Sequence, residues 1–276
     1  MSSNPRPVLV FKYGGNAMTN SQLKSEVVDA ISSLKSKGYA VVVVHGGGPF
    51  IQEALTNAKL ESKFIDGQRQ TSVEALRHVE QTLKGKVNTE LVSLFNAAGN
   101  RAVGLSGKDG KTVIAKKRKH ETQKNGKWVD VDLGQVGDVE RVDPELIEML
   151  LERDFLPVIT CIASDKDGAD FNINGDLFAG YIAGALRAEQ FIVLTDVDGL
   201  LQDRNRPESI LSNLSRADLE QLRTEGVIQG GMIPKTDACI EAIEAGAKSA
   251  RIINGTKPSQ ITLLFENQQT GTLIEK

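Results

Sequence analysis

The chain is poor in cysteine and has no long apolar run, and each absence excludes a class of protein. Its only cysteines, Cys161 and Cys239, are far apart and match neither a metal-ligand spacing nor a Cys-x-x-Cys motif. Both lie in apolar contexts, so we expect two buried free thiols, as in the reducing cytoplasm. No segment approaches the roughly 20 apolar residues that cross a bilayer. Residues 1–6 are too few and too polar for a secretory signal.

An excess of charge of one sign is also lacking. The 33 lysines and arginines nearly balance the 36 acidic residues, which gives a net charge of -3. Such a chain has no general attraction to nucleic acid or to an anionic membrane, so local features must bind any anionic ligand. The 40% of hydrophobic and 25% of charged residues are ordinary for a globular protein. A length of 276 residues predicts one large domain or two closely joined lobes.

Short β-branched runs alternate with amphipathic helical patterns, which indicates βαβ units and a mainly parallel sheet. The expected strands are residues 8–12, 40–44, 157–162, 191–194 and 250–253. Two helix starts carry capping signals, Asn20 before a run with apolar residues at helical spacing, and Asp143 before Pro144. The strands are apolar throughout, which predicts an α/β fold whose open sheet is covered on both faces.

Two polar stretches interrupt this alternation. Residues 63–70 contain Gly67, and residues 108–137 contain the dipeptides Asp109-Gly110 and Asn125-Gly126, which are typical of hairpin turns. We expect both stretches to form β-hairpins over one end of the sheet, where lids over ligands are common. The basic run at 116–119 is interpreted as a solvated part of the second hairpin.

Two glycine-rich turns each follow a predicted buried strand. They read Lys12-Tyr13-Gly14-Gly15-Asn16 and His45-Gly46-Gly47-Gly48-Pro49. At the carboxyl end of a parallel strand, glycines let the backbone approach an anion, and the next helix adds free N–H groups and a partial positive charge. Both turns therefore predict phosphate binding. Neither reads G-x-x-x-x-G-K-[ST] or G-x-G-x-x-G, which disfavours a P-loop NTPase and leaves a dinucleotide-binding dehydrogenase as a weaker alternative.

Three further motifs follow in the second half of the chain. They are Phe171-Asn172-Ile173-Asn174-Gly175-Asp176, Thr195-Asp196-Val197-Asp198-Gly199-Leu200 and Gly230-Gly231-Met232-Ile233-Pro234-Lys235. Taken singly, each is equally well explained as a loop, a turn or a helix cap. Together with the glycine turns they indicate phosphoryl transfer, which needs positioning and positive charge rather than covalent help from the protein. Lys12 and Lys235 would supply that charge, and Asp176 would hold both ammonium groups through charge-assisted hydrogen bonds.

The three histidines give little support to other chemistry. His45 is interpreted as a structural hydrogen-bonding residue rather than a base. His78 and His120 have no neighbours in sequence that would make a metal site or a catalytic triad. A nucleophilic hydrolase is therefore disfavoured, and no metal-binding residues are predicted.

The ordered motifs resemble those of the acetylglutamate kinases, a branch of the amino acid kinase family. The resemblance also includes Asp66-Gly67-Gln68-Arg69 and Leu105-Ser106-Gly107-Lys108-Asp109-Gly110, and it runs from about residue 8 to the end of the chain. It implies a three-layer αβα sandwich in one domain, 1–276, with 1–175 binding the acyl substrate and phosphate and 176–276 binding the nucleotide. The implied activity is phosphorylation of the γ-carboxylate of N-acetyl-L-glutamate by ATP with Mg²⁺, a step of arginine biosynthesis.

The resemblance also implies roles for individual residues. Lys12 and Lys235 would stabilise the transition state, with Asp176 orienting them. The residues expected at the acyl substrate are Gly47, Gly48, Arg69, Asn172 and Asn174, where arginine can pair with a carboxylate bidentately. The residues expected at the nucleotide are Gly15, Thr195, Asp196, Val197, Asp198, Gly199, Leu200, Leu201, Val227, Ile228, Gln229 and Met232. Mg²⁺ would be held chiefly by phosphate oxygens and water.

The sequence departs from the family pattern in two places. Gly175 stands where alanine is usual, a change that should leave the chemistry intact. Arginine-inhibited members carry an extra helix before the first strand, whereas only residues 1–7 precede it here. We therefore expect no arginine feedback through such a helix, and we expect a homodimer.

Two alternatives to this activity stay open. One is a sister kinase that acts on aminoadipate or glutamate presented on a carrier protein, which the basic run at 116–119 could dock. The other is a non-catalytic metabolite sensor, which would not need Lys12, Asp176 and Lys235. Neither nucleic acid nor a membrane is expected as a partner.

Overall fold

An eight-stranded sheet forms the centre of the computed structural model, which describes residues 6–124, 126–266 and 270–276. The strand order is β14-β16-β15-β13-β1-β2-β10-β5. The strands are β1 (Val8–Tyr13), β2 (Ala40–His45), β5 (Ala102–Ser106), β10 (Leu156–Thr160), β13 (Gln190–Thr195), β14 (Asn213–Ser215), β15 (Ala250–Asn254) and β16 (Thr272–Glu275). All neighbouring strands from β5 to β15 in this order pair in parallel. Strand β16 is antiparallel to β15, and β14 is parallel to β16. The predicted mainly parallel sheet is confirmed.

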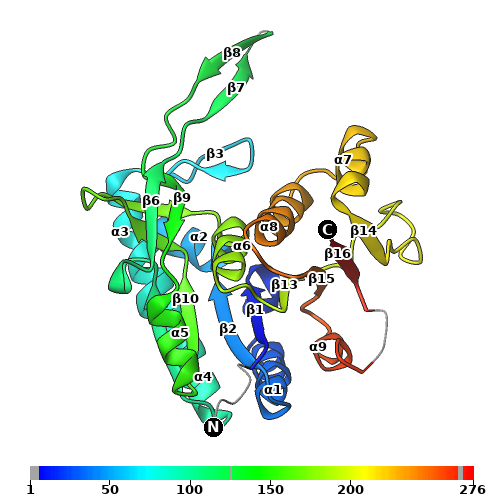
Figure 1. Ribbon diagram of the computed structural model, residues 1–276. Helices are drawn as coiled ribbons and strands as arrows, with labels where there is room; N and C mark the ends of the chain where they lie inside the picture. The colour runs from blue at the N-terminus through cyan, green and yellow to red at the C-terminus, as the bar shows by residue number, and fades with distance from the viewer. Residues whose placement is uncertain (1–5, 125, 267–269) are drawn as a thin grey trace.

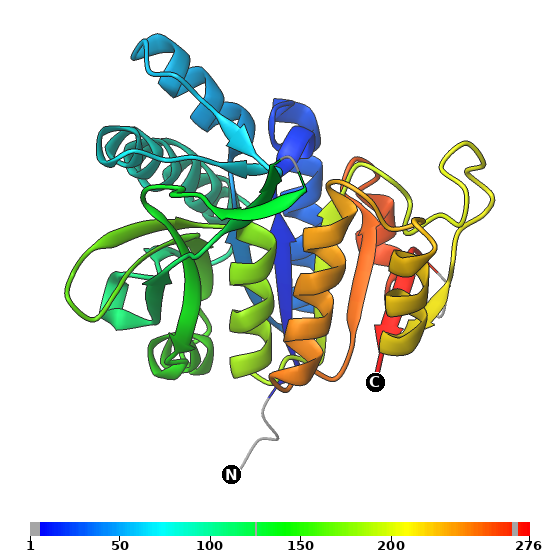
Figure 2. The ribbon, with the colours of Figure 1, turned by 90° about the horizontal axis from the view of Figure 1, so that it is seen from above.

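Helices cover both faces of this sheet, and Figure 2 shows α6 and α8 on one face and α1 on the other. The first core contains α6 (Gly175–Ala185) and α8 (Met232–Glu244), together with α2 (Gly48–Asn57), α3 (Val73–Glu80), α5 (Glu145–Glu152) and α7 (Arg216–Thr224). The second core contains α1 (Ser21–Ser36), α4 (Thr89–Ala97) and α9 (Ser259–Leu263). Val42 of β2 points into the first core and Val43 into the second. Burial on both faces explains why the strands are apolar throughout.

Two helix starts show how local sequence sets the ends of elements. The side-chain oxygen of Asn20 accepts from the N–H of Leu23 and caps α1, as predicted. Helix α5 begins at Glu145, one residue beyond the predicted start at Pro144. The prediction of Asp143 as N-cap is wrong, because Pro144 is the N-cap residue and has no side-chain cap hydrogen bond, although Asp143 still accepts from the N–H of Glu145 over 3.3 Å.

Two expectations from composition can be compared with the structure. Cys161 and Cys239 are both buried and free, as predicted. Within the described ranges, no helix combines the length and the apolar character needed to cross a bilayer.

Two hairpins stand at the edge of the sheet where β1 and β2 end (Figure 1). In the first, β3 (Phe64–Ile65) pairs with β4 (Gln68–Arg69), as predicted for residues 63–70. In the second, β7 (Glu121–Lys124) pairs with β8 (Lys127–Asp130) and projects from the body of the molecule. Asn125, predicted in the turn between them, lies outside the described residues.

The prediction of a hairpin turn at Asp109-Gly110 is wrong. Residues Asp109–Lys111 form a short 3-10 helix between β5 and β6 (Val113–Lys117), which belong to different sheets. No hairpin exists there to be closed. The carboxylate of Asp109 instead accepts from the N–H of Ser106.

A small barrel, which the sequence did not predict, completes the fold. Strand β6 joins β9 (Val136–Val142), β11 (Ile162–Ser164) and β12 (Asp170–Ile173). Strand β12 contains the first residues of the motif that the sequence indicated as a loop or cap. It runs directly into α6, so the barrel brings Asn172 to the edge of the main sheet.

Candidate active site

Three helices begin where β1 and β2 end. Residues 14–15 follow β1, and residues 46–48 lead from β2 into α2, which has proline in its first turn. Helices α6 and α8 begin at Gly175 and Met232. Helix N-termini carry a partial positive charge, so this edge of the sheet suits an anionic ligand.

Two lysines from opposite ends of the chain meet one carboxylate at this edge. The Nζ atom of Lys12 lies 3.0 Å from Oδ1 of Asp176, and the Nζ atom of Lys235 lies 3.2 Å from Oδ2. Burial raises the pKa of Asp176, but the two ammonium groups outweigh burial and leave this pKa below its ordinary value. Asp176 is therefore ionised at neutral pH and holds both cations. The structure brings together the three residues that the sequence analysis grouped.

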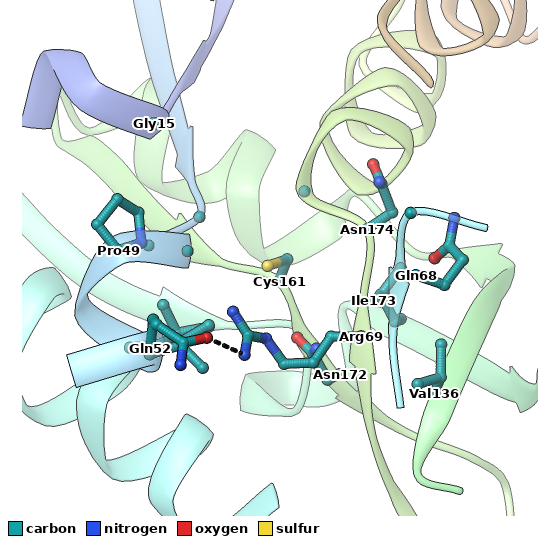
Figure 3. Close-up of a pocket in the computed structure, with 18 of the residues that line it drawn as sticks. Gly15, Pro49, Gln52, Gln68, Arg69, Val136, Cys161, Asn172, Ile173 and Asn174 are labelled. Atoms are coloured by element: carbon teal, nitrogen blue, oxygen red, sulfur yellow. Dashed lines mark hydrogen bonds between the residues drawn. The ribbon is translucent and has the colours of Figure 1, made fainter. Parts of the chain in front are cut away.

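A pocket of about 530 Å³ opens on the Lys12 side of this cluster. Its walls come from both glycine turns, the β3–β4 hairpin and β12. Figure 3 shows Arg69 extending across the pocket towards Gln52, with Asn172 and Cys161 close by. The residues predicted at the acyl substrate all line it, namely Gly47, Gly48, Arg69, Asn172 and Asn174, together with Lys12. Gly15, predicted at the nucleotide, lines this pocket rather than the second one.

The guanidinium group of Arg69 is held in place by neutral groups. It donates to Oε1 of Gln52 over 2.9 Å and to the hydroxyl of Ser62, and it lies 4.5 Å from the centre of the Phe64 ring. No carboxylate pairs with it in the part of the chain that the structure describes. Burial lowers the pKa of Arg69, but a guanidinium stays charged in proteins. An oriented cation without an acid partner suits a ligand carboxylate.

A second pocket, of about 380 Å³, opens on the Lys235 side. The predicted residues that line it are Thr195, Asp196, Val197, Gly199, Leu200, Leu201, Val227, Gln229 and Met232. Asp198 instead points away, and its carboxylate accepts from Lys257 over 2.7 Å and from Asn254 over 2.8 Å. The side chain of Ile228 is buried in the core. The Lys12–Asp176–Lys235 cluster therefore separates two pockets.

The comparisons with known proteins agree on one family. Residues 7–254 match the model of the amino acid kinase family. The chain belongs to this family. The acetylglutamate kinase of Archaeoglobus fulgidus is 42% identical over 268 residues, 97% of this chain and 92% of that protein. The acetylglutamate kinase of Moorella thermoacetica is 43% identical over 267 residues, 96% and 90% of the two chains.

A solved structure has the same fold over nearly the whole chain. The structure of smu.665 from Streptococcus mutans UA159 superposes with a TM-score of 0.75 at 27% identity, covering 97% of this chain and 98% of that one. Membership of the amino acid kinase family makes the chain a kinase with ATP as phosphoryl donor.

Two residues that line the pockets, Arg204 and Cys161, belong to none of the motifs in the sequence. Arg204 lines the second pocket and donates to the carbonyl oxygen of Gln229 over 3.0 Å, but it comes from a polar loop without a motif.

Cys161 lines the first pocket, and burial raises the pKa of its thiol to about 11, so the thiol stays protonated. A Cβ atom on Gly175 would lie 3.6 Å from this sulfur, an ordinary contact. The alanine that the resemblance leads us to expect at this position would therefore fit here too.

Proposed function

We propose that the chain transfers the γ-phosphoryl group of ATP to the γ-carboxylate of N-acetyl-L-glutamate, a step of arginine biosynthesis. The observation that carries this proposal is the cluster of Lys12, Asp176 and Lys235 between two pockets. One pocket suits a small acid and the other a nucleotide, so the reacting groups would meet at the two ammonium groups. The names of the curated relatives support the same acceptor.

The acyl substrate is assigned to residues 1–175. Arg69 would pair with its α-carboxylate, since a planar guanidinium matches a carboxylate bidentately. Asn172 would bind the acetamido end. Asn174 accepts from the N–H groups of Asp176 and Leu177 through its side-chain oxygen, which leaves its amide nitrogen to donate to the substrate.

The nucleotide is assigned to residues 176–276, in the second pocket. Its phosphates would extend towards the glycine turns, where Gly15 has a φ of +70° that favours glycine. The N–H groups at the start of α2 and the partial positive charge at the starts of α2 and α8 would face the negative charge of the phosphates. Asp198 and Ile228 would support the pocket from behind rather than contact the nucleotide.

The proposed reaction balances without a proton transfer. A γ-carboxylate oxygen attacks the γ-phosphorus in line, and the bond from phosphorus to the oxygen bridging the β-phosphate breaks. The products are N-acetyl-L-glutamyl 5-phosphate and ADP. A carboxylate with a pKa of about 4.3 is already ionised at neutral pH, so no general base is required. Lys12 and Lys235 would stabilise the charge that spreads over the transferred group, with Asp176 fixing their positions.

Mg²⁺ fits this site as part of the nucleotide complex. No group of three or more His, Cys, Asp or Glu side chains able to hold a metal occurs in residues 6–124, 126–266 and 270–276. Asp176 is already paired with two lysines. Phosphate oxygens and water would therefore be the main ligands, and the ion would neutralise phosphate charge.

The proposal includes a homodimer in the cytoplasm. The two buried free thiols support a reducing compartment. The dimer is carried over from the family resemblance alone. Sedimentation equilibrium tests it, and a monomeric mass at enzyme concentrations used in the assay would refute it.

The carrier-linked alternative is not favoured. It needs a basic docking face, for which the sequence offered the run at 116–119. Lys117 lies 3.0 Å from a carboxylate oxygen of Asp132, and Arg118 lies 2.9 Å from one of Asp138. Intramolecular ion pairs therefore neutralise two of the four charges in the run.

An acceptor comparison tests the proposed function. ADP release is measured with N-acetylglutamate, glutamate, aspartate and carrier-linked glutamate at equal concentrations. We expect N-acetylglutamate to give the highest kcat/KM, because Asn172 would bind the acetamido group that the other two free acids lack. Higher kcat/KM with glutamate, aspartate or the carrier-linked acceptor would refute the assignment.

A further inference from the structure

Asn88 and His45 form a buried hydrogen-bonded pair beneath the second glycine turn. Asn88 ends the π-helix η2 (Gln81–Asn88), which joins α3 to α4. Its side-chain Nδ2 lies 2.9 Å from Nε2 of His45 and 2.9 Å from the carbonyl oxygen of Val158. Asn88 is 2% exposed and His45 is 0% exposed. None of the roles proposed above uses either side chain.

Hydrogen-bond chemistry fixes the proton on His45. A carbonyl oxygen only accepts, so the atom of Asn88 that faces Val158 must be its amide nitrogen. This nitrogen gives its second hydrogen to Nε2 of His45, which must then be unprotonated. Burial lowers the pKa of His45 to about 4, so the ring is neutral at pH 7 and carries its one proton on Nδ1. Nδ1 lies 2.9 Å from the carbonyl oxygen of Gly46 and donates to it.

The bond from His45 sets the direction of the next N–H group. In a trans peptide, the C=O of Gly46 and the N–H of Gly47 point in opposite directions, and the described residues contain no cis peptide bond. Because the carbonyl of Gly46 is turned towards the buried imidazole, the N–H of Gly47 is turned away from the core, where Gly47 lines the first pocket. The N–H of Gly46 donates to the carbonyl oxygen of Tyr13 over 3.1 Å, which anchors the same turn to β1.

The π-helix supports the turn at a second point. A Cβ atom on Gly47 would lie 2.6 Å from Cδ2 of Leu83, and one on Gly104 would lie 2.2 Å from Oδ1 of Asn88. Both glycines therefore make room for side chains of η2. A π-helix bonds residues five apart, which brings Leu83 and Asn88 to the same side of the helix. In an α-helix of 3.6 residues per turn, these two side chains would diverge.

We propose that His45 and Asn88 are positioning residues that aim the N–H of Gly47 at the transferred phosphoryl group. This inference rests on the proposed kinase function. Gly47 would touch the reacting group, while His45 and Asn88 would act only through it. The π-helix is the element that brings Asn88 to this position.

Two substitutions of His45 separate aiming from simple packing. The amide nitrogen of His45→Asn occupies the place of Nδ1 and can still donate to Gly46. The amide group of His45→Gln occupies the place of Nε2, so it keeps a partner for Asn88 and loses the donor to Gly46. Both variants lose the imidazole ring, which makes each a control for the other.

We expect kcat of His45→Gln to fall about 10- to 100-fold, the effect of a small misplacement of a group that contacts the transition state. His45→Asn should stay within about 5-fold of wild type, with KM for both substrates little changed in either variant. Equal losses in the two variants, or full activity of His45→Gln, would overturn the positioning role.

The ring nitrogens of wild-type protein give a second readout that needs no variant to be active. In protein labelled with ¹⁵N at histidine, NMR spectra that correlate ring ¹H and ¹⁵N nuclei through two-bond couplings should show His45 protonated at Nδ1 and unprotonated at Nε2 at pH 7. A proton on Nε2 would overturn the inference. If wild type fails to phosphorylate N-acetylglutamate, the proposed function is refuted. The kcat values of His45→Gln and His45→Asn are then compared with the acceptor that wild type uses. The tautomer of His45 tests the positioning role independently of the acceptor.

Discussion

Replacing Asp176 by asparagine removes the negative charge that pairs with two lysines. The Asp176 side chain is 9% exposed, and its oxygens lie 3.0 and 3.2 Å from the two ammonium groups. The lysine side chains are 10% and 18% exposed, so water screens them poorly. Removing one partner of a buried ion pair typically costs about 3–5 kcal/mol. For a chain of this size, such a loss lowers the Tm by roughly 10 °C.

The same change should reduce turnover. Without the carboxylate between them, the ammonium groups of Lys12 and Lys235 lose their fixed positions and repel each other. The loss of one preorganised charge-stabilising group typically lowers kcat about 10²- to 10³-fold. Thermal unfolding and ADP release are measured on the same preparations of wild type and Asp176→Asn.

Asp154 offers a matched control. It also accepts from two cations, Arg6 over 2.6 Å and Lys35 over 3.1 Å, but its side chain is 55% exposed. Its φ of +62° is one that asparagine tolerates well. Asp154→Asn should therefore cost at most about 1 kcal/mol and leave kcat unchanged. If Asp176→Asn lowers the Tm no more than this control and keeps wild-type turnover, the reasoning about the central cluster is refuted.

Three further predictions concern the walls of the pockets and the loss of stability at low pH. Arg69→Gln should raise KM for N-acetylglutamate more than 10-fold without changing KM for ATP. Arg101→Gln is the control, because it also removes an arginine stacked on a phenylalanine, and it should change neither KM. Equal effects of the two variants would contradict the assignment of Arg69 to the substrate carboxylate. Gly47→Ala should cost activity because its Cβ would meet Leu83, and Gly47→Ala with Leu83→Ala should recover part of it; no recovery would place the cause elsewhere. Because the pKa of Asp176 is lowered in the folded protein, its ionised carboxylate stabilises the fold in full above the unfolded-state pKa of about 3.9. This stabilisation is lost as pH falls through the folded-state pKa, so below about pH 4 the Tm of wild type should fall more steeply than that of Asp176→Asn. Parallel curves of Tm against pH would contradict this.

The main sheet and the central cluster could be predicted because simple rules govern them. Strands apolar throughout imply a sheet covered on both faces, and the carboxyl ends of neighbouring parallel strands share one edge. Lys12 lies one residue before the end of β1, and Asp176 lies in the first turn of α6, which packs against that sheet. The motifs alone therefore predict a common site.

The small barrel could not be predicted because its strands are short and three of its four strand pairs join segments that are far apart in sequence. Strand β6 pairs with both β9 and β11, and β11 has only three residues. The dipeptide Asp109-Gly110 gives a hairpin signal, but only long-range pairing decides whether a hairpin forms there. Local turn chemistry cannot show that β5 and β6 belong to different sheets.

Side-chain direction within a motif was also beyond the sequence. Asp198 lies between residues that line the second pocket, yet its carboxylate turns to Lys257 and Asn254. Asn88 has no motif at all, and its place beneath the glycine turn depends on a π-helix that the apolar pattern does not reveal. These contacts depend on which neighbours the folded chain supplies.

Lys235→Met tests the central claim most directly, because it removes one ammonium group and keeps the unbranched side chain as far as Cε. Binding of N-acetylglutamate is measured by calorimetry, and phosphoryl transfer is measured in a single turnover with ATP. We predict that N-acetylglutamate binds within a few-fold of wild type while the transfer rate falls at least about 10²-fold. An unchanged transfer rate would contradict a mechanism built on two lysines joined by Asp176.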